Sequence, residues 1–130
     1  MQVADTRSLA GLRVLVVEDE ALLSMLVEDA LKESGCTVLG PYMHVDAAMP
    51  VVLDRAQAID LAMLDLEIAG EWSFSLAERL IDRKVPVVFS TGHDEAAIDA
   101  RWRWIPRLRK PFSDQELMRI LAEVAAGRAT

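Results

Sequence analysis

The sequence is poor in cysteine, in long hydrophobic runs and in positive charge. Cys36 is its one cysteine, so no internal disulfide can form and a cysteine-rich zinc module is excluded. Arg13 and Pro86 interrupt the longest apolar segments, which therefore fall short of the roughly 18 residues that a membrane helix needs. Arg13 and the acidic residues 18–20 also flank the first apolar segment, unlike a signal peptide. These features favour a cytoplasmic protein with no membrane partner.

Basic residues are outnumbered by acidic ones. The chain holds 14 Lys and Arg against 21 Asp and Glu, a formal net charge of −7. Phosphate backbones attract cations, so this balance argues against a general nucleic-acid binder. What the chain does have is 52% hydrophobic residues, enough at 130 residues to bury one core without disulfides or a structural metal. We expect one domain over residues 10–127, preceded by an extension at 1–9 and followed by a tail at 128–130.

Short, continuous apolar runs indicate strands that are buried on both faces of a parallel sheet. These runs lie at 12–17, 36–39, 59–64, 85–89 and 105–108. Segments with helical periodicity lie between them, at 22–31, 45–56, 74–81 and 117–124, with a short helix-like stretch at 94–101. Ser113 and Glu116 form a capping-box signature before the last helix. The alternation predicts an α/β fold, a three-layer, doubly wound (βα)5 sandwich around a five-stranded parallel sheet.

Reactive side chains stand where the predicted strands end. The acidic run 18–20 follows the first strand, while Asp65, Thr91 and Lys110 follow later ones. Each has an ordinary structural explanation when taken singly, as a helix cap, a turn residue or a solvated lysine. Ligands of doubly wound folds bind at the carboxyl ends of the strands, and all of these residues fall at that end. The joint pattern therefore favours a functional site.

Phosphoryl transfer to a carboxylate is the chemistry that fits this set. Asp19 and Asp65 would repel each other unless a cation lay between them, and an open site made of oxygen ligands suits Mg²⁺. The metal would neutralise charge on an incoming phosphoryl group while Asp65 attacks it as the nucleophile. Lys110 and Thr91 would hold the remaining phosphoryl oxygens.

Four motifs together resemble the receiver domain of two-component response regulators. They are Val-Val-Glu-Asp-Glu at 16–20, Leu-Asp at 64–65, Ser-Thr-Gly at 90–92 and Lys-Pro-Phe at 110–112. The resemblance implies the flavodoxin-like strand order 2-1-3-4-5 and a signalling domain rather than an enzyme, with a Lys110–Pro111 peptide that is cis. It also implies a role for each site residue: Asp65 as phosphoacceptor, Asp19 as a direct Mg²⁺ ligand, Glu18 as a ligand through water, the Glu67 backbone carbonyl as a further ligand, Thr91 as the switch hydroxyl and Lys110 as the phosphate-binding lysine.

Arg107 departs from the common receiver pattern, which has an aromatic residue at that position. Together with the segments 70–74, 89–93 and 106–112, it makes the chain resemble the "FAT GUY" subclass of single-domain receivers, which also lacks the aromatic. Arg107, Trp102 and Trp104 would form a partner or switch surface if exposed; if the tryptophans are buried, they mark only the edge of a half-covered strand.

By the same resemblance, the partners are a sensor histidine kinase, of HWE type or another, or a histidine phosphotransfer protein, and a downstream protein that the sequence does not identify. The domain would switch a protein-binding surface or act as a phosphate shuttle or sink. Glu67 and His93 would modulate hydrolysis of the acyl phosphate or be plain surface residues.

Three alternatives come from other functional classes. A pseudo-receiver would bind a partner constitutively, without phosphorylation, but it leaves the intact set of site residues unexplained. A haloacid-dehalogenase-type phosphohydrolase expects Asp-x-Asp on the nucleophile strand, whereas Glu67 stands two residues after Asp65. Nucleic-acid binding would use the basic residues of segment 101–110 and would depend steeply on salt.

Overall fold

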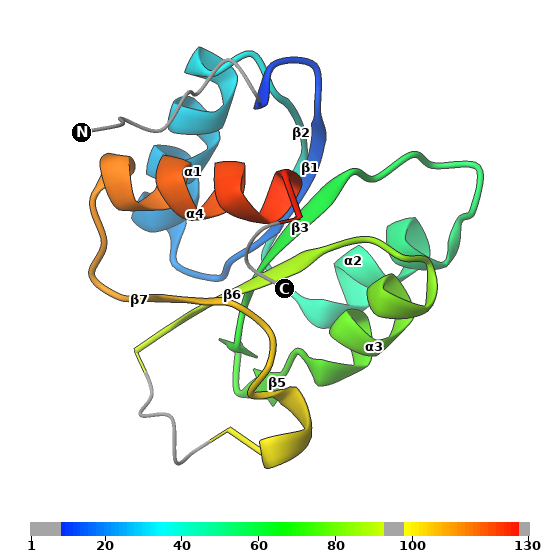
Figure 1. The fold of residues 1–130 in the computed structure, drawn as a ribbon. Helices are drawn as coiled ribbons and strands as arrows, with labels where there is room; N and C mark the ends of the chain where they lie inside the picture. Colours follow the sequence, from blue (N-terminus) through cyan, green and yellow to red (C-terminus); the bar gives the residue numbers. More distant parts are fainter. Residues whose placement is uncertain (1–8, 93–97, 128–130) are drawn as a thin grey trace.

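Five parallel strands form a single sheet at the centre of the molecule (Figure 1). The structure is a computed structural model that describes residues 9–92 and 98–127. The strands are β1 (Arg13–Val17), β2 (Thr37–Tyr42), β3 (Leu61–Asp65), β6 (Val87–Thr91) and β7 (Arg107–Arg109). Their order across the sheet is β2-β1-β3-β6-β7, and every neighbouring pair is parallel. The predicted order 2-1-3-4-5 is confirmed.

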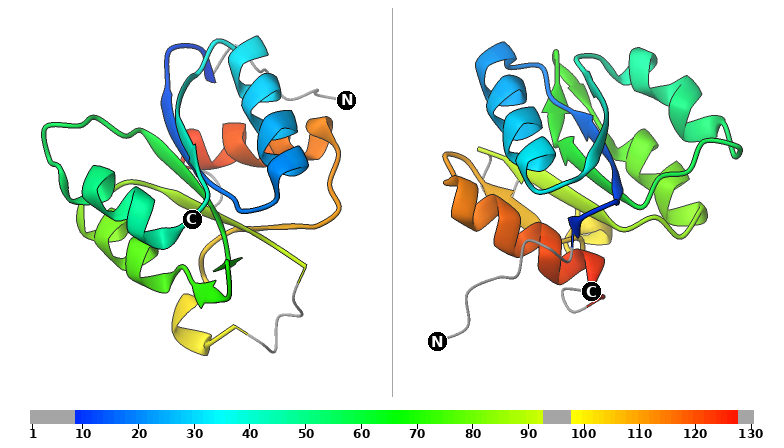
Figure 2. Two further views of the ribbon diagram at one scale, coloured as in Figure 1. Left: turned by 180° about the vertical axis from the view of Figure 1, so that it is seen from behind. Right: turned by 90° about the horizontal axis from the view of Figure 1, so that it is seen from above.

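Helices cover both faces of the sheet (Figure 2). Buried residues of α1 (Ala21–Glu33) and α4 (Asp114–Ala125) pack on one face, and those of α2 (Val45–Leu53) and α3 (Phe74–Asp82) pack on the other. This arrangement confirms the three-layer, doubly wound fold class. No helix within the described residues has the length and apolarity to cross a membrane.

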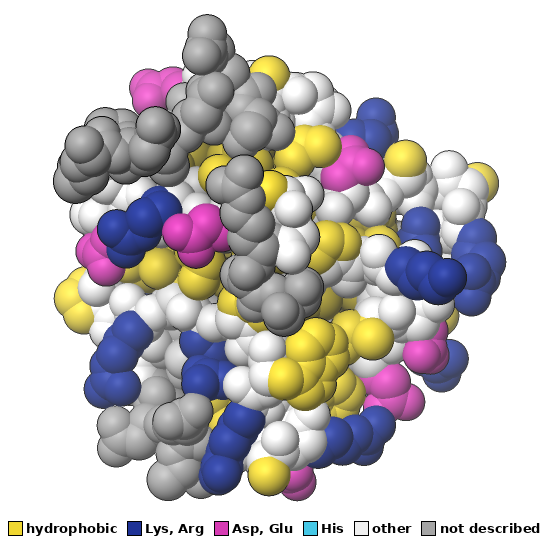
Figure 3. All heavy atoms as spheres, in the orientation of Figure 1, with side chains coloured by type: hydrophobic (Ala, Val, Ile, Leu, Met, Phe, Trp, Pro, Cys, Tyr) yellow, Lys and Arg dark blue, Asp and Glu magenta, His cyan; other side chains and the backbone are white. Residues whose placement is uncertain are grey.

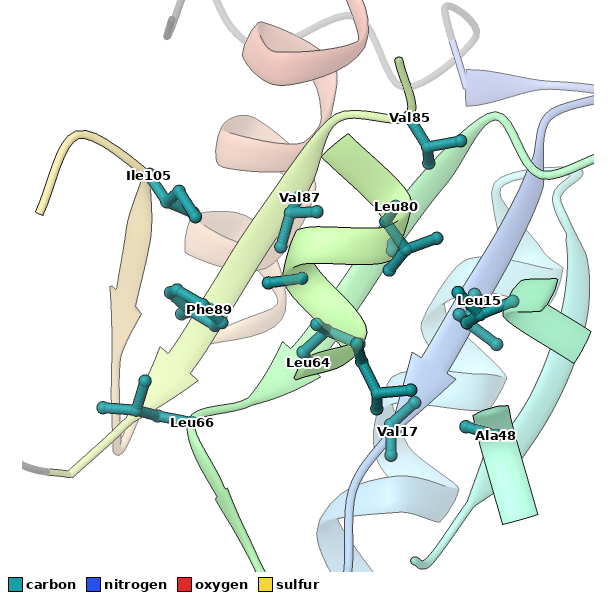
Figure 4. Packing of buried hydrophobic residues seen from close by; sticks show 14 of the residues in the cluster. Leu15, Val17, Ala48, Leu64, Leu66, Leu80, Val85, Val87, Phe89 and Ile105 are labelled. Atoms are coloured by element: carbon teal, nitrogen blue, oxygen red, sulfur yellow. The ribbon is translucent and has the colours of Figure 1, made fainter. Parts of the chain in front are cut away.

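Each strand sends alternate side chains to opposite faces of the sheet, which explains why the strand sequences are apolar throughout. Leu15 of β1 belongs to the core beneath α2 and α3, whereas the next residue, Val16, belongs to the core beneath α1 and α4. Figure 4 shows the first of these cores, where Leu64 of β3 and Phe89 of β6 gather near Leu80 of α3. The two cores fix the strands relative to one another and so fix where their ends lie.

Helix α2 ends at Leu53, three residues before the predicted end at residue 56. The Asp54 side chain accepts a hydrogen bond from the Ala56 N–H at 3.0 Å, which forms a turn in place of another helical turn. The Arg83 guanidinium donates to the carbonyl oxygens of Val52 at 2.9 Å and of Gln57 at 2.6 Å. These bonds hold the turn against the end of α3 and replace helical hydrogen bonds.

The connection between β6 and β7 differs from the sequence prediction. Residues 94–97 of the predicted stretch 94–101 lie outside the described residues, and so does His93. The described remainder holds a 3₁₀ helix, Ala100–Trp102, capped by the Asp99 side chain, which accepts from the Arg101 N–H at 3.0 Å. Within the residues described, this single turn stands where a helix was expected.

Trp102 is part of the core, being only 7% exposed. Its ring stacks on Phe74 with centroids 5.5 Å apart, and the Arg101 guanidinium covers the ring at 4.6 Å. The prediction that Trp102 lies on an exposed partner surface is therefore wrong, because α3 and the 3₁₀ turn enclose the side chain. The alternative of a strand edge also fails, since the residue belongs to a 3₁₀ helix.

The predicted capping box starts helix α4 as expected. The Ser113 hydroxyl accepts from the Glu116 N–H at 3.1 Å, and the Glu116 carboxylate accepts from the Ser113 N–H at 3.0 Å. Two N–H groups that the helix itself cannot satisfy are thereby paired.

Substitution Ser113→Ala is expected to lower the free energy of unfolding by about 1 kcal/mol, because it leaves the Glu116 N–H without its capping oxygen. Urea denaturation followed by circular dichroism measures the change. Ser75→Ala, at an exposed position of α3, is the matched control and should cause little or no loss. Equal stability losses in the two variants would contradict the role of the cap.

Candidate functional site

The carboxyl ends of four strands bring the predicted site residues to one end of the sheet. Asp65 is the last residue of β3, Thr91 is the last of β6, and Lys110 directly follows β7. The Lys110 N–H donates to the Thr91 carbonyl oxygen at 2.8 Å, which ties the ends of β6 and β7 together. Glu18 follows β1, and its N–H donates to the Tyr42 carbonyl oxygen at 2.9 Å. Sheet pairing therefore sets the positions of these side chains.

Three carboxylates crowd together at this end. One oxygen from each of Glu18, Asp19 and Asp65 lies within 4.8 Å of the others. Glu18 is buried and Asp65 is only 6% exposed, so water shields their charges poorly. Such a cluster is unfavourable unless a cation or protons balance it.

Lys110 supplies one balancing charge. Its Nζ lies 3.0 Å from Glu18 Oε1, 3.1 Å from Asp65 Oδ2 and 3.3 Å from Glu20 Oε1. Sequence reasoning noted Glu20 only as part of the acidic run and assigned it no role. The acidic run was the sequence feature that could have pointed to Glu20. Only the fold shows that its exposed carboxylate reaches the Lys110 ammonium.

The site carries more negative charge than Lys110 neutralises. Burial, followed by the charge of Glu18, raises the pKa of Asp65 from 3.8 to about 7, although Lys110 acts in the opposite direction. Burial works against the charged form of Lys110, but its hydrogen bond with Glu18 and the attraction of Asp65 raise its pKa. The site therefore attracts a further cation when Asp65 is ionised.

Asp19 is held by a short hairpin that sequence reasoning missed. The strands β4 (Glu67–Ile68) and β5 (Glu71–Trp72) pair antiparallel, and the Ala69 N–H at their turn donates to Asp19 Oδ2 at 2.8 Å. Burial would raise the pKa of Asp19, but this bond and the hydrogen bond with Asp65 lower it. Asp19 is thus kept ionised, and the Ala69 N–H orients its carboxylate.

The remaining predicted residues lie around this centre. Thr91 is buried at the end of β6, and Glu67 lies on β4, next to the site. Arg107 of β7 donates from Nη1 to the carbonyl oxygens of Arg103 at 2.8 Å and Ile105 at 3.3 Å. Trp104 is 56% exposed, in contrast to Trp102.

The donor set fits Mg²⁺. All side-chain ligands within reach are carboxylate oxygens, the hard donors that Mg²⁺ prefers, and no described His or Cys joins them. Asp19, Asp65 and Glu18 could each offer one oxygen to the same ion, and Glu18 also contacts Lys110 at 3.0 Å.

Comparison with known proteins identifies the family. The family model described as the response regulator receiver domain matches residues 14–122. The chain belongs to this family. Receiver domains are signalling modules of two-component systems, and the family predicted from the motifs is confirmed. The expected cis peptide between Lys110 and Pro111 is also present.

Solved receivers resemble this receiver over most of its length. The BeF3-activated conformation of SdrG from Pseudomonas melonis Fr1 is 38% identical, with a TM-score of 0.74, and the match covers 89% of this chain and 98% of that one. The non-phosphorylated HemR receiver domain from Leptospira biflexa is 27% identical, with a TM-score of 0.77 and coverage of 88% and 94%.

Curated relatives are longer proteins. The sensory transduction protein LytT of Bacillus subtilis is 32% identical over 114 residues, which are 85% of this chain and 46% of LytT. The chain spans about half the length of the curated relatives it matches.

Substitution Asp65→Asn is expected to stabilise the metal-free receiver. A folded-state pKa of about 7 against 3.8 means that the folded protein binds more protons than the unfolded one between these values, so the ionised carboxyl costs stability as pH rises through this range. Loss of the Lys110 contact offsets part of the gain. We expect on the order of 1 kcal/mol at pH 8 with EDTA, shrinking towards pH 4, measured by urea denaturation.

Asp82→Asn is the control, because this aspartate is exposed on α3. It should show no stabilisation that grows with pH. An Asp65→Asn variant less stable than the parent at pH 8 would contradict the prediction.

Proposed function

We propose that this receiver accepts a phosphoryl group on Asp65 from a phosphohistidine of a partner protein, in a reaction that depends on Mg²⁺. The observation that carries the proposal is the contact of a buried aspartate with Lys110, 3.1 Å away, beside the carboxylates of Glu18 and Asp19. A nucleophile, a cation for the phosphoryl oxygens and a place for a metal are thereby combined at one end of the sheet.

In the transfer step, an Asp65 oxygen attacks the phosphorus atom. The bond from phosphorus to the histidine nitrogen breaks, and its electron pair stays on that nitrogen. Lys110 moves its hydrogen bonds from the carboxylate to the phosphoryl oxygens, and the Thr91 hydroxyl donates to another of them. Mg²⁺, held by Asp19, Asp65, Glu18 through water and the Glu67 carbonyl, would neutralise charge on the carboxylates and the phosphoryl group.

The charge balance of the site explains why the reaction would need the metal. With a pKa of about 7 in the metal-free protein, Asp65 is partly protonated near neutral pH and is then a poor nucleophile. A divalent cation beside it favours the ionised form. The same cation lowers the repulsion between the carboxylates and an anionic donor.

The partners we propose are those that the receiver family and the resemblance to its "FAT GUY" subclass imply. The donor is a sensor histidine kinase, of HWE type or another, or a histidine phosphotransfer protein. The phosphorylated domain then switches a downstream protein contact or serves as a phosphate shuttle or sink, in the cytoplasm. LytT is named a sensory transduction protein, which agrees with a signalling role.

Incubation with acetyl phosphate and Mg²⁺ is expected to add one phosphoryl group, detected by intact mass. Asp65→Asn should abolish the addition, whereas the exposed Asp82→Asn should leave it unchanged. Beryllofluoride, a phosphoryl mimic, covers the case of a short-lived acyl phosphate and should shift amide resonances around residues 65, 91 and 110. If neither reagent has an effect, the domain is a phosphorylation-independent binding module and the proposal fails.

Mg²⁺ should stabilise the receiver, by about 2.7 kcal/mol at a concentration 100 times its dissociation constant. Substitution Asp19→Asn is expected to remove most of this gain, because it deletes the half-buried carboxylate oriented by Ala69. Thermal unfolding with and without Mg²⁺ measures the difference. Glu71→Gln removes a nearby charge on the same hairpin and should keep the gain. Equal stabilisation of parent and Asp19→Asn would place the metal elsewhere.

A further inference from the structure

One buried hydroxyl beside the candidate site has no hydrogen-bond partner among the described residues. It is that of Ser90, a residue only 1% exposed. The other buried serines are paired: Ser24 Oγ donates to the Ala21 carbonyl oxygen at 2.8 Å, and Ser73 Oγ donates to the Leu66 carbonyl oxygen at 3.2 Å. A buried hydroxyl without a partner costs stability, so the exception at Ser90 needs a physical reason.

Strand pairing places Ser90 between Asp65 of β3 and Leu108 of β7, which are its register partners on either side. Register partners in parallel strands send their side chains to the same face of the sheet. Met63, two residues before Asp65, and Val88, two before Ser90, both belong to the core beneath α1 and α4, as does Leu108. Ser90 and Asp65 therefore leave their strands side by side on that face.

Lys110 crosses the end of β6 to reach its partners. It follows β7, whereas Asp65 ends β3 and Glu18 follows β1, and β6 lies between β7 and these two strands. Its ammonium lies 3.1 Å from Asp65 and 3.0 Å from Glu18. The lysine side chain thus passes over the end of the strand that carries Ser90, on the face to which the Ser90 hydroxyl points.

The arginines of β7 do not share this path. Figure 3 shows Lys and Arg side chains around β7 and the end of β6. Arg107 and Arg109 alternate with Leu108, however, and so leave the strand on the opposite face. Lys110 is therefore the cation that the Ser90 hydroxyl faces.

We infer that Ser90 is a positioning residue for Lys110 during phosphoryl acceptance, an inference that rests on the proposed function. The resting ammonium lies within 3.3 Å of three carboxylates, those of Glu18, Asp65 and Glu20, which match its three N–H groups. Water competes for Glu20, whose side chain is 63% exposed, so that contact is weak. After phosphorylation, the N–H groups go to Glu18, the phosphoryl group and the Ser90 hydroxyl, which replaces Glu20 and holds the ammonium over β6.

The hydroxyl has opposite effects on the two states. In the resting protein it is buried and unpaired, so it is less favourable there than an alanine methyl group. In the phosphorylated protein it accepts a hydrogen bond from a charged donor, which is a strong interaction. A serine with a packing role alone would affect both states alike.

The test compares the parent with Ser90→Ala. Thermal unfolding without ligand should show a variant at least as stable as the parent, because it loses an unpaired hydroxyl. Titration with beryllofluoride in the presence of Mg²⁺, followed by amide resonances, should show about tenfold weaker binding. Ser90→Cys keeps a side chain of similar size but offers only a weak acceptor, so it should bind beryllofluoride as Ser90→Ala does.

The Lys110 ammonium gives a direct readout of its position. The chain has three lysines, of which Lys32 and Lys84 are exposed and exchange their ammonium protons with water quickly. The Lys110 side chain is only 15% exposed. With beryllofluoride bound, the parent should show a Lys110 ammonium resonance that Ser90→Ala broadens through faster exchange.

Ser24→Ala is the matched control, because it removes a buried hydroxyl that is already paired. It should lower stability with and without beryllofluoride and leave the affinity unchanged. The inference is overturned if Ser90→Ala or Ser90→Cys binds beryllofluoride as tightly as the parent, or if Ser90→Ala loses resting stability as Ser24→Ala does. A parent that binds no beryllofluoride and accepts no phosphoryl group overturns the proposed function as well, whereas undiminished binding by Ser90→Ala overturns this inference alone.

Discussion

The structure depends on a balance of charge at the end of its sheet. The carboxylates of Glu18, Glu20 and Asp65 lie within 3.3 Å of one ammonium, that of Lys110, and Asp19 stands beside them. One lysine cannot neutralise this set, and burial keeps water from doing so. The raised pKa of Asp65 is the direct result. A cation that binds here would lower the repulsion between the carboxylates and stabilise the site. We propose that Mg²⁺ binds for this reason and that a phosphoryl group is then accepted.

The hydrophobic layers make this arrangement possible. Isolated carboxylates would move apart, but Asp65 and Glu18 follow strands whose side chains are locked into the two cores on both faces of the sheet. Pairing of β6 with β7 then brings Lys110 to them across the sheet. The stability of the cores thus holds unfavourable charges in place, which is a common property of functional sites.

Aromatic contacts connect the candidate site with the segment that leads into β7. An aromatic stack, Trp72 on Phe74 and Phe74 on Trp102, connects the hairpin beside Asp19 with the 3₁₀ turn before β7. Arg107 then holds the carbonyl oxygens of that segment, at a position where most receivers have an aromatic residue. The aromatic that is usual on the last strand is therefore replaced by a cation that fixes the backbone of the segment before β7.

The sequence by itself determined the fold class, the strand order through the receiver motifs, and which reactive side chains follow the strands. Buried parallel strands must be apolar throughout, and reactive side chains of such folds follow the strands, so both leave a local pattern. Only the tertiary structure decided that Trp102 is buried while Trp104 is exposed, that Glu20 reaches Lys110, and that the Ala69 N–H holds Asp19. These facts depend on contacts between residues distant in the chain, for which spacing and periodicity carry no signal.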